Sequence, residues 1–241
     1  FPVDPNFRKS FPKAQPNLQL TKKGKLSPQT LAKFKKIVGT QTFSDDPNVR
    51  ARHSIGKFYT EIFNARFGKV EAMVDAVLFP KSEEEVQKII ELANSLKIPV
   101  VPYGAGSSVT KALQAPKGGI SVDLSLMDKI IEFNSQDSTV TVQTGISGPA
   151  LEAFLNEKGY TCGHFPQSFE FSTIGGWIAA KGAGQASTGY GKMEDILLSL
   201  TAITPAGKFE SKPYPAASIG PDMFKFFLGS AFIFKYFLRA A

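Results

Sequence analysis

The pattern of polar and apolar positions first becomes regular after the N-terminal segment. Residues 1–26 are rich in Pro, Asn and Lys without sustained periodicity, so they are expected to form an arm lying over the body of the protein. Ser27 and Pro28 then predict a helix start, because serine caps free amides and proline fits the first helical position. Gly39 is the expected helix stop. The apolar face of this helix consists of Leu31, Phe34, Ile37 and Val38.

The clearest unit is a strand, a helix and a second strand that ends in a glycine-rich turn. The apolar run 74–79 predicts a buried strand. Ser82 and Glu85 have the spacing of a capping box, and apolar residues then recur at helical spacing. A second strand begins at residues 99–101 and leads directly into the turn at residues 104–108.

Further strands and helices follow without internal repeats, so the predicted fold class is α+β. A second glycine-rich region covers residues 175–191. The other predicted elements are strands at residues 120–124, 129–133 and 139–144, a helix near 149–158, and a hairpin of strands 196–203 and 208–211.

Composition indicates a folded, soluble protein. With 42% hydrophobic and 12% aromatic residues, the 241-residue chain can fill a substantial core. No apolar run reaches the roughly 18–20 residues needed to span a bilayer, and no signal peptide is recognised after Phe1. The single cysteine, Cys162, excludes an internal disulfide and a metal site built from this chain's thiols alone. We therefore expect a cytoplasmic location, with a peroxisomal or membrane-associated one as the alternative.

The net charge of +7 is concentrated at the N-terminus. Residues 1–70 carry 14 Lys and Arg against 4 Asp and Glu, whereas the remainder carries 14 against 17. A solvated basic face is the simplest explanation, and peripheral contact with an anionic membrane or an acidic partner is the alternative. Because no recognisable nucleic-acid-binding module accompanies the charge, no nucleic-acid partner is expected.

Three segments carry candidate chemistry. The turn at residues 104–108 follows a strand, and its small residues let backbone amides approach a phosphate. Val109 stands where the dinucleotide fingerprint has its third glycine, and no phosphate-loop lysine follows, so an ordinary tight turn is an alternative. Residues 166–177 and 182–191 repeat the combination of glycines and hydroxyls. Together the three segments predict a long, polyanionic and partly flat ligand.

These segments resemble the FAD-binding domain of the vanillyl-alcohol oxidase / p-cresol methylhydroxylase superfamily, most closely its alkyldihydroxyacetonephosphate synthase branch. The glycine-rich turn is common to the superfamily, whereas residues 170–177 and 190–196 are typical of the synthase branch. The resemblance is carried by residues 52–63, 102–108, 144–146, 159–164, 170–177 and 190–196.

The resemblance implies a two-subdomain FAD-binding fold without the substrate cap domain. An arm and helix would occupy residues 1–50, and the FAD-binding domain residues 51–230, with subdomains at about 70–125 and 126–230. Residues 231–241 depart from the family pattern and form an atypical aromatic tail, which is expected to cover a core or await a cap domain or partner subunit.

The resemblance also implies the cofactor and its contacts. FAD would bind non-covalently, with its pyrophosphate on residues 102–108, its ribityl and ring along residues 167–173, and residues 180–183 continuing that wall. The implied cofactor-binding residues are Pro102, Tyr103, Gly104, Ala105, Gly106, Ser107, Ser108, Gln167, Ser168, Phe169, Ser172, Thr173, Gly175, Gly176, Ala180, Gly182 and Ala183.

Other conspicuous residues have ordinary structural explanations. His164 could touch cofactor or substrate, but a hydrogen-bonded structural histidine is favoured, and His53 is a weaker candidate still. The neighbouring carboxylates Glu194 and Asp195 are expected to face different directions rather than form an acid–base pair. For Trp177, core packing is favoured over flavin stacking.

The expected function is that of a flavin-dependent oxidoreductase acting on a small-molecule substrate. Synthase-like exchange of acyl for alkyl on dihydroxyacetone phosphate is implied by the branch, and oxidation of a 2-hydroxy acid such as D-lactate or glycolate is the alternative. A flavin-carrying module that needs a cap domain or a partner subunit for turnover is a third interpretation. No catalytic residue is assigned from the sequence.

Overall fold

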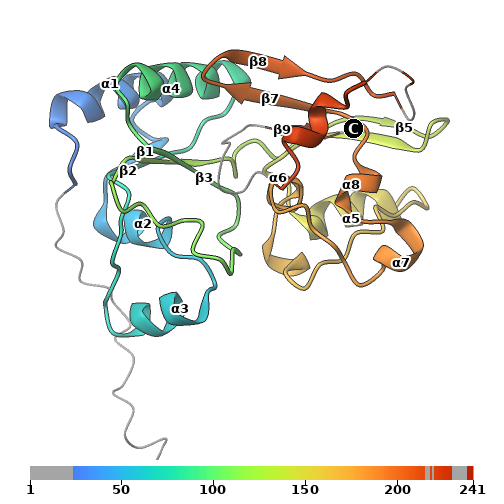
Figure 1. Cartoon of the computed structure of the whole chain (residues 1–241), viewed down its shortest axis with the longest axis horizontal. Helices are drawn as coiled ribbons and strands as arrows, with labels where there is room; N and C mark the ends of the chain where they lie inside the picture. The colour runs from blue at the N-terminus through green and yellow to red at the C-terminus, as the bar shows by residue number, and fades with distance from the viewer. Residues whose placement is uncertain (1–23, 215–217, 219, 230–237, 241) are drawn as a thin grey trace, which may run out of the picture.

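The computed structural model describes residues 24–214, 218, 220–229 and 238–240. Figure 1 shows two β-sheets beside each other, with helices packed on each. Most of the predicted N-terminal arm and most of the aromatic tail lie outside the described residues. No helix in the described ranges is long and apolar enough to cross a membrane.

The first sheet has the strand order β1-β2-β4-β3. Strand β4 pairs in parallel with both β2 and β3, whereas β1 is antiparallel to β2. Parallel strands bring their carboxyl ends to one edge, where ligands bind in open α/β sheets. The strands are β1 (Phe43–Ser44), β2 (Ala76–Leu78), β3 (Val100–Tyr103) and β4 (Ile120–Asp123).

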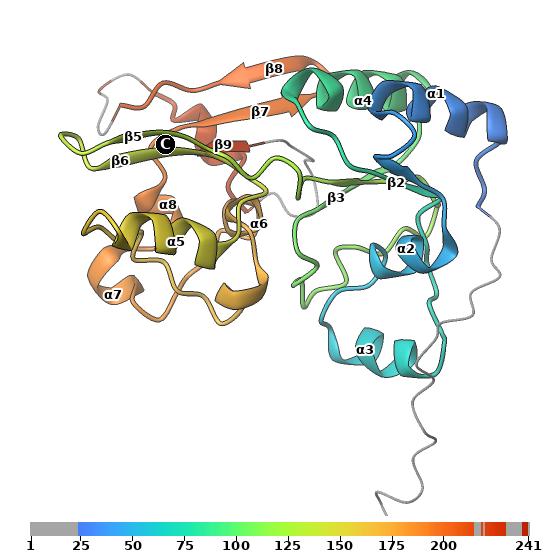
Figure 2. The same cartoon turned by 180° about the vertical axis from the view of Figure 1, so that it is seen from behind.

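Helices cover both faces of this sheet (Figures 1 and 2). On one face lie α1 (Pro28–Val38) and α4 (Glu83–Ser95), and on the other α2 (Pro47–Arg52) and α3 (Tyr59–Arg66). The predicted caps of α1 are confirmed, because the Ser27 side chain accepts from the Thr30 amide and Gly39 ends the helix at φ +91°.

The capping box predicted for α4 is only half formed. Ser82 accepts from the Glu85 amide at 3.3 Å, as expected. The Glu85 carboxylate, however, accepts from the Lys81 amide at 2.7 Å. The Glu85 carboxylate therefore bonds the residue before the N-cap instead of the Ser82 amide, so the reciprocal hydrogen bond of a capping box is not formed.

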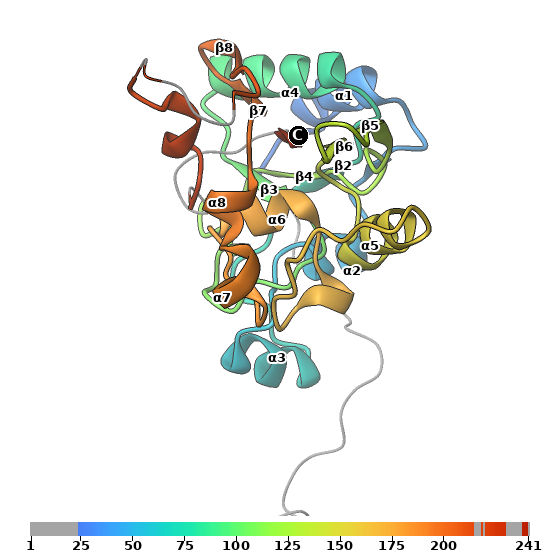
Figure 3. The ribbon, with the colours of Figure 1, turned by 90° about the vertical axis from the view of Figure 1, so that its right-hand side faces the viewer.

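The second sheet is antiparallel, with the order β5-β6-β9-β7-β8. Short helices pack against one of its sides, as the rotated view in Figure 3 also shows. The strands are β5 (Ile130–Asn134), β6 (Thr139–Gln143), β7 (Leu200–Thr204), β8 (Gly207–Glu210) and β9 (Leu238–Ala240); the helices are α5 (Gly148–Asn156), α6 (Ile174–Ala179), α7 (Ser187–Tyr190) and α8 (Met193–Ile196), with 3-10 turns at Phe169–Phe171 and Met223–Phe226.

The start of the predicted strand 196–203 is wrong. Residue Ile196 ends helix α8, and strand β7 begins only at Leu200. The helix is fixed locally because the Asp195 carboxylate accepts from the Lys192 amide at 2.8 Å. A polar cap therefore overrides the apolar run that suggested an earlier strand start.

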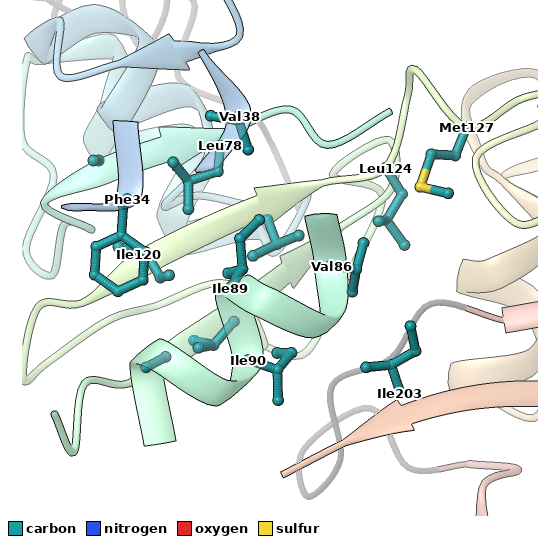
Figure 4. Packing of buried hydrophobic residues seen from close by; sticks show 14 residues of the cluster. Phe34, Val38, Leu78, Val86, Ile89, Ile90, Ile120, Leu124, Met127 and Ile203 are labelled. Carbon is teal, nitrogen blue, oxygen red and sulfur yellow. The ribbon is translucent and has the colours of Figure 1, made fainter. Parts of the chain in front are cut away.

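Helix α4 joins the two sheets. Its apolar face packs on the first sheet, and Ile203 of β7 belongs to the same buried cluster (Figure 4). At the polar rim, Lys208 of β8 pairs with Glu83 of α4 at 2.9 Å, with both side chains partly exposed. The apolar contact provides most of the stabilisation, since an exposed ion pair contributes about 0–1 kcal/mol.

Candidate cofactor site

The glycine loop, residues 104–108, presents unused backbone donors after β3. Within the described part of the chain, none of its five amides donates to a protein acceptor. Gly106 has φ +68°, and a Cβ there would lie 2.5 Å from the Tyr103 hydroxyl. Consecutive free amides around a left-handed residue form a concave anion-binding nest. The loop can therefore receive a phosphate without losing an internal hydrogen bond.

The second predicted segment touches the first. A Cβ on Gly104 would lie 2.4 Å from Thr173 Oγ1, so the glycine loop passes against the start of α6. Thr173 Oγ1 also accepts from the Gly176 amide at 3.4 Å, which caps that helix. Two segments expected to bind one ligand are thus brought together from the two halves of the fold.

Several predicted cofactor residues serve the fold directly. The Ser172 hydroxyl donates to the Ser168 carbonyl and accepts from Trp177 Nε1, both at 2.7 Å. The Gly175 amide donates to the Thr144 carbonyl at 2.9 Å. Phe169 packs on Trp177, with ring centroids 6.1 Å apart. These groups hold the second segment in shape, whereas the side chain of Gln167 is exposed.

The third segment closes around a buried histidine. Ala180 and Ala183 are exposed, and a Cβ on Gly182 between them would lie 3.1 Å from His164 Nε2. His164 is fully buried and its ring lies 4.7 Å from that of Trp177. Neither ring nitrogen of His164 has a hydrogen-bond partner among the described residues. The expectation of a hydrogen-bonded histidine is therefore wrong, while the predicted burial of Trp177, which is 3% exposed, is confirmed.

Burial lowers the pKa of His164, which keeps the folded ring neutral. Because the unfolded chain binds the proton more readily, the free energy of unfolding should fall as the pH drops below about 6.5. Urea unfolding at pH 7.5 and pH 5.0 tests this. His164→Phe should show a smaller loss over that range, and an equal loss in both proteins would contradict the assignment.

Cys162 is held in an unreactive setting. Burial and the neighbouring Glu152 carboxylate raise its pKa to about 11. Glu152 itself accepts from the Cys162 amide at 3.1 Å and from the Thr161 hydroxyl, so it ties this segment to α5. The thiol also lines an apolar cavity of about 240 Å³, to which no implied cofactor residue contributes.

Native Cys162 should react slowly with Ellman's reagent at pH 8. The thiolate is the reactive form, so the raised pKa predicts a rate at least roughly a hundredfold below that of the urea-unfolded chain. Because the sequence contains one cysteine, the unfolded sample is its own control for one thiol per chain. Equal rates before and after unfolding would show that the thiol is not protected.

The carboxylates of α8 are not an acid–base pair, as expected. Glu194 pairs with Lys181 at 2.6 Å, whereas Asp195 caps its own helix. No group of three side chains suited to holding a metal ion occurs among the described residues.

One buried polar cluster beside the glycine loop escaped the sequence analysis. His53 Nε2 lies 2.8 Å from Asp123 Oδ2, and its ring centroid lies 4.2 Å from that of Tyr103. His53 lies in the segment 52–63 that carries the family resemblance, but Asp123 is 70 positions away and lies in none of the segments that carry it. The only available signal was the polar residue Asp123 at the end of a predicted buried strand.

Comparison with known proteins identifies the class that this geometry suggests. A sequence model described as the FAD binding domain matches residues 74–211, more than half of the chain. The chain belongs to this FAD-binding domain family, and FAD is its cofactor.

Its relatives include synthases and dehydrogenases. The chain is 40% identical over 194 residues to alkyldihydroxyacetonephosphate synthase from Caenorhabditis elegans, covering 78% of this chain and 32% of the relative. For the same synthase from Dictyostelium discoideum the identity is 32% over 206 residues, covering 84% and 34%. The mitochondrial D-lactate dehydrogenase [cytochrome] of Arabidopsis thaliana is 36% identical over 168 residues, covering 68% and 29%.

A solved structure of alkyldihydroxyacetonephosphate synthase matches with a TM-score of 0.87 and 29% identity, covering 95% of this chain and 43% of that chain. This likeness confirms the α+β, two-subdomain FAD-binding fold that the sequence resemblance implied. The chain spans about a third of the length of the curated relatives and less than half of the solved synthase.

Proposed function

We propose that this chain is the FAD-binding portion of a flavin-dependent enzyme of the alkyldihydroxyacetonephosphate synthase type. The observation that carries the proposal is the row of five amides in the glycine loop that no acceptor among the described residues uses, held against Thr173. A diphosphate needs several donors at close range, and the loop offers them. The identity to two synthases supports the choice of branch.

In this proposal, different residues contact different parts of the cofactor. The glycine loop holds the pyrophosphate, and Gly104 allows its backbone to lie close to the second segment. Gln167 and Ser168 face the ribityl and ring, while Ser172 and Thr173 hold that wall in shape through their own hydrogen bonds. Ala180 and Ala183 continue the wall with small side chains that leave room for a flat ring.

FAD supplies the redox chemistry, and the chain supplies orientation and a dry setting. The neutral, fully buried His164 lines the third segment with a ring nitrogen that can hydrogen-bond a group entering beside Gly182. Non-covalent attachment is favoured because a thiol of high pKa is a poor nucleophile and Cys162 lies outside the three segments.

A 2-hydroxy acid dehydrogenase is the second candidate. The specific observation in its favour is the 36% identity to a D-lactate dehydrogenase over 168 residues. The synthase matches cover more of this chain, so the synthase type is preferred. In either case, substrate-binding groups on a further domain or partner subunit would complete the enzyme, because the matched region covers only about a third of each relative.

An absorption spectrum of the purified chain, taken after incubation with excess FAD and gel filtration, tests the cofactor proposal. Bands near 370 and 450 nm are expected with the protein, as for any oxidised flavin. Acid precipitation should release all of the flavin to the supernatant. Flavin retained in the pellet would contradict non-covalent binding, and a colourless protein would overturn the proposal.

Turnover separates the two candidate activities. A form of the protein that spans the full length of the synthases is assayed with an acyl dihydroxyacetone phosphate and a fatty alcohol, and in parallel with D-lactate and an artificial electron acceptor. Product in the first assay alone is expected. Reduction of the acceptor by D-lactate alone would replace the synthase assignment with the dehydrogenase.

A further inference from the structure

The segment 53–57 holds both ends of the glycine loop. At the start of the loop, the His53 ring lies on Tyr103, with centroids 4.2 Å apart. At its end, the Lys57 amide donates to the Ser108 carbonyl at 2.6 Å, and a Cβ on Gly56 would lie 2.3 Å from that same oxygen. A short connection between α2 and α3 thus contacts the loop on either side of its five free amides.

His53 is fixed by acceptors on both of its nitrogens. Nδ1 lies 2.8 Å from the Val49 carbonyl, and Nε2 lies 2.8 Å from Asp123 Oδ2. A carbonyl oxygen can only accept, so Nδ1 must carry a proton. Nε2 faces a carboxylate oxygen, so both ring nitrogens are engaged and the ring cannot turn without losing a hydrogen bond.

The surroundings hold this pair in place. His53 and Asp123 are 8% and 5% exposed. His53 also stands at the carboxyl end of α2. Asp123 Oδ1 is occupied by the Ser125 amide at 2.8 Å, so its orientation is set. Tyr103, Phe79 and Asp123 surround the ring, and the permanently charged Arg52 acts on Tyr103.

Tyr103 contacts both His53 and the glycine loop, and so links the pair of His53 and Asp123 to the loop. Its hydroxyl lies where a side chain on Gly106 would have to go, so the ring sets the left-handed turn of Gly106. Burial and Asp123 raise the pKa of Tyr103, which keeps the phenol protonated at neutral pH. A displaced Tyr103 would change the turn, and with it the direction of the amides on either side.

We propose that His53, paired with Asp123, is a positioning residue that holds Tyr103 and so preforms the glycine loop for a diphosphate. This inference rests on the proposed function, because the diphosphate is that of FAD. It predicts that FAD affinity declines when a substitution removes one of the two hydrogen bonds of the His53 ring.

The test is FAD binding by the flavin-free full chain, measured through the quenching of flavin fluorescence at neutral pH. Asp123→Ala should raise the dissociation constant on the order of tenfold, because it removes the partner of His53 Nε2 and leaves a buried ring nitrogen without a hydrogen bond. Asp123→Asn should bind FAD like the wild type, because its amide can still hydrogen-bond both the His53 ring and the Ser125 amide.

His53→Phe is a further variant, since it keeps an aromatic ring against Tyr103 but loses both hydrogen bonds. Its dissociation constant should also be raised on the order of tenfold. Far-ultraviolet circular dichroism confirms that each variant is folded. Wild-type affinity in both Asp123→Ala and His53→Phe would overturn the inference alone, whereas absence of FAD binding by the wild type would overturn the proposed function and this inference with it.

Discussion

Replacing Gly104 with alanine is expected to weaken FAD binding on the order of a hundredfold. The added Cβ would stand 2.4 Å from Thr173 Oγ1, well inside van der Waals contact. Thr173 is 6% exposed and caps α6, so it cannot rotate away without losing that cap. The loop must therefore retreat, and its amides move from the diphosphate. Fluorescence titration of the flavin-free chain with FAD measures the change.

Gly189→Ala is the matched control for this variant. Gly189 is an exposed glycine of α7 that is not among the implied cofactor-binding residues, and a Cβ there meets no heavy atom within 4 Å. Its FAD affinity should equal that of the wild type. Unchanged affinity in Gly104→Ala would show that the glycine loop and the Thr173 segment do not share the ligand.

The largest loss of stability is expected from Gly145→Ala. A Cβ on Gly145 would lie 1.8 Å from the Leu124 carbonyl oxygen and 2.8 Å from that of Met127. Both obstacles are backbone atoms, and the Gly145 amide donates to the Met127 carbonyl at 2.9 Å. The chain after β6 here crosses the connection that leaves the first sheet, so the strain falls on the junction between the sheets.

This substitution should lower the free energy of unfolding by about 3 kcal/mol, at the upper end of overpacking effects. For a domain of this size the melting temperature should fall by roughly 6–12 °C. Thermal unfolding followed by circular dichroism measures it, again with Gly189→Ala as the control. A melting temperature within a degree or so of the wild type would mean that Leu124 and Gly145 are not packed as described.

Local elements were largely predictable because their signals lie within a few residues. Ser27, Pro28 and Gly39 fixed the ends of α1 through caps and backbone preferences that act over one helical turn. The start of β7 was misplaced because the local signal there was ambiguous. An apolar run does not distinguish a strand from a short helix, and the Asp195 cap decided the matter.

The candidate site was predictable in part. The glycine loop and the Thr173 segment were recognised separately by their small and hydroxyl residues, and their contact confirms that they belong together in space. The sequence did not show which of these residues bind the ligand and which support the fold, because a serine that binds a ligand and one that hydrogen-bonds Trp177 look alike in a sequence. The pair of His53 and Asp123 was invisible for another reason, since its partners lie 70 positions apart.

The amino-acid sequence alone determined the glycine loop's backbone freedom, the helix caps and the resemblance to FAD-binding proteins. All of these depend on residue type and short spacing. Only the tertiary structure decided which amides stay free, which hydroxyls are already used and which histidine supports the loop. Those properties arise when the parallel strands β3 and β4 end side by side, placing Tyr103 and Asp123 at one edge for His53 to contact.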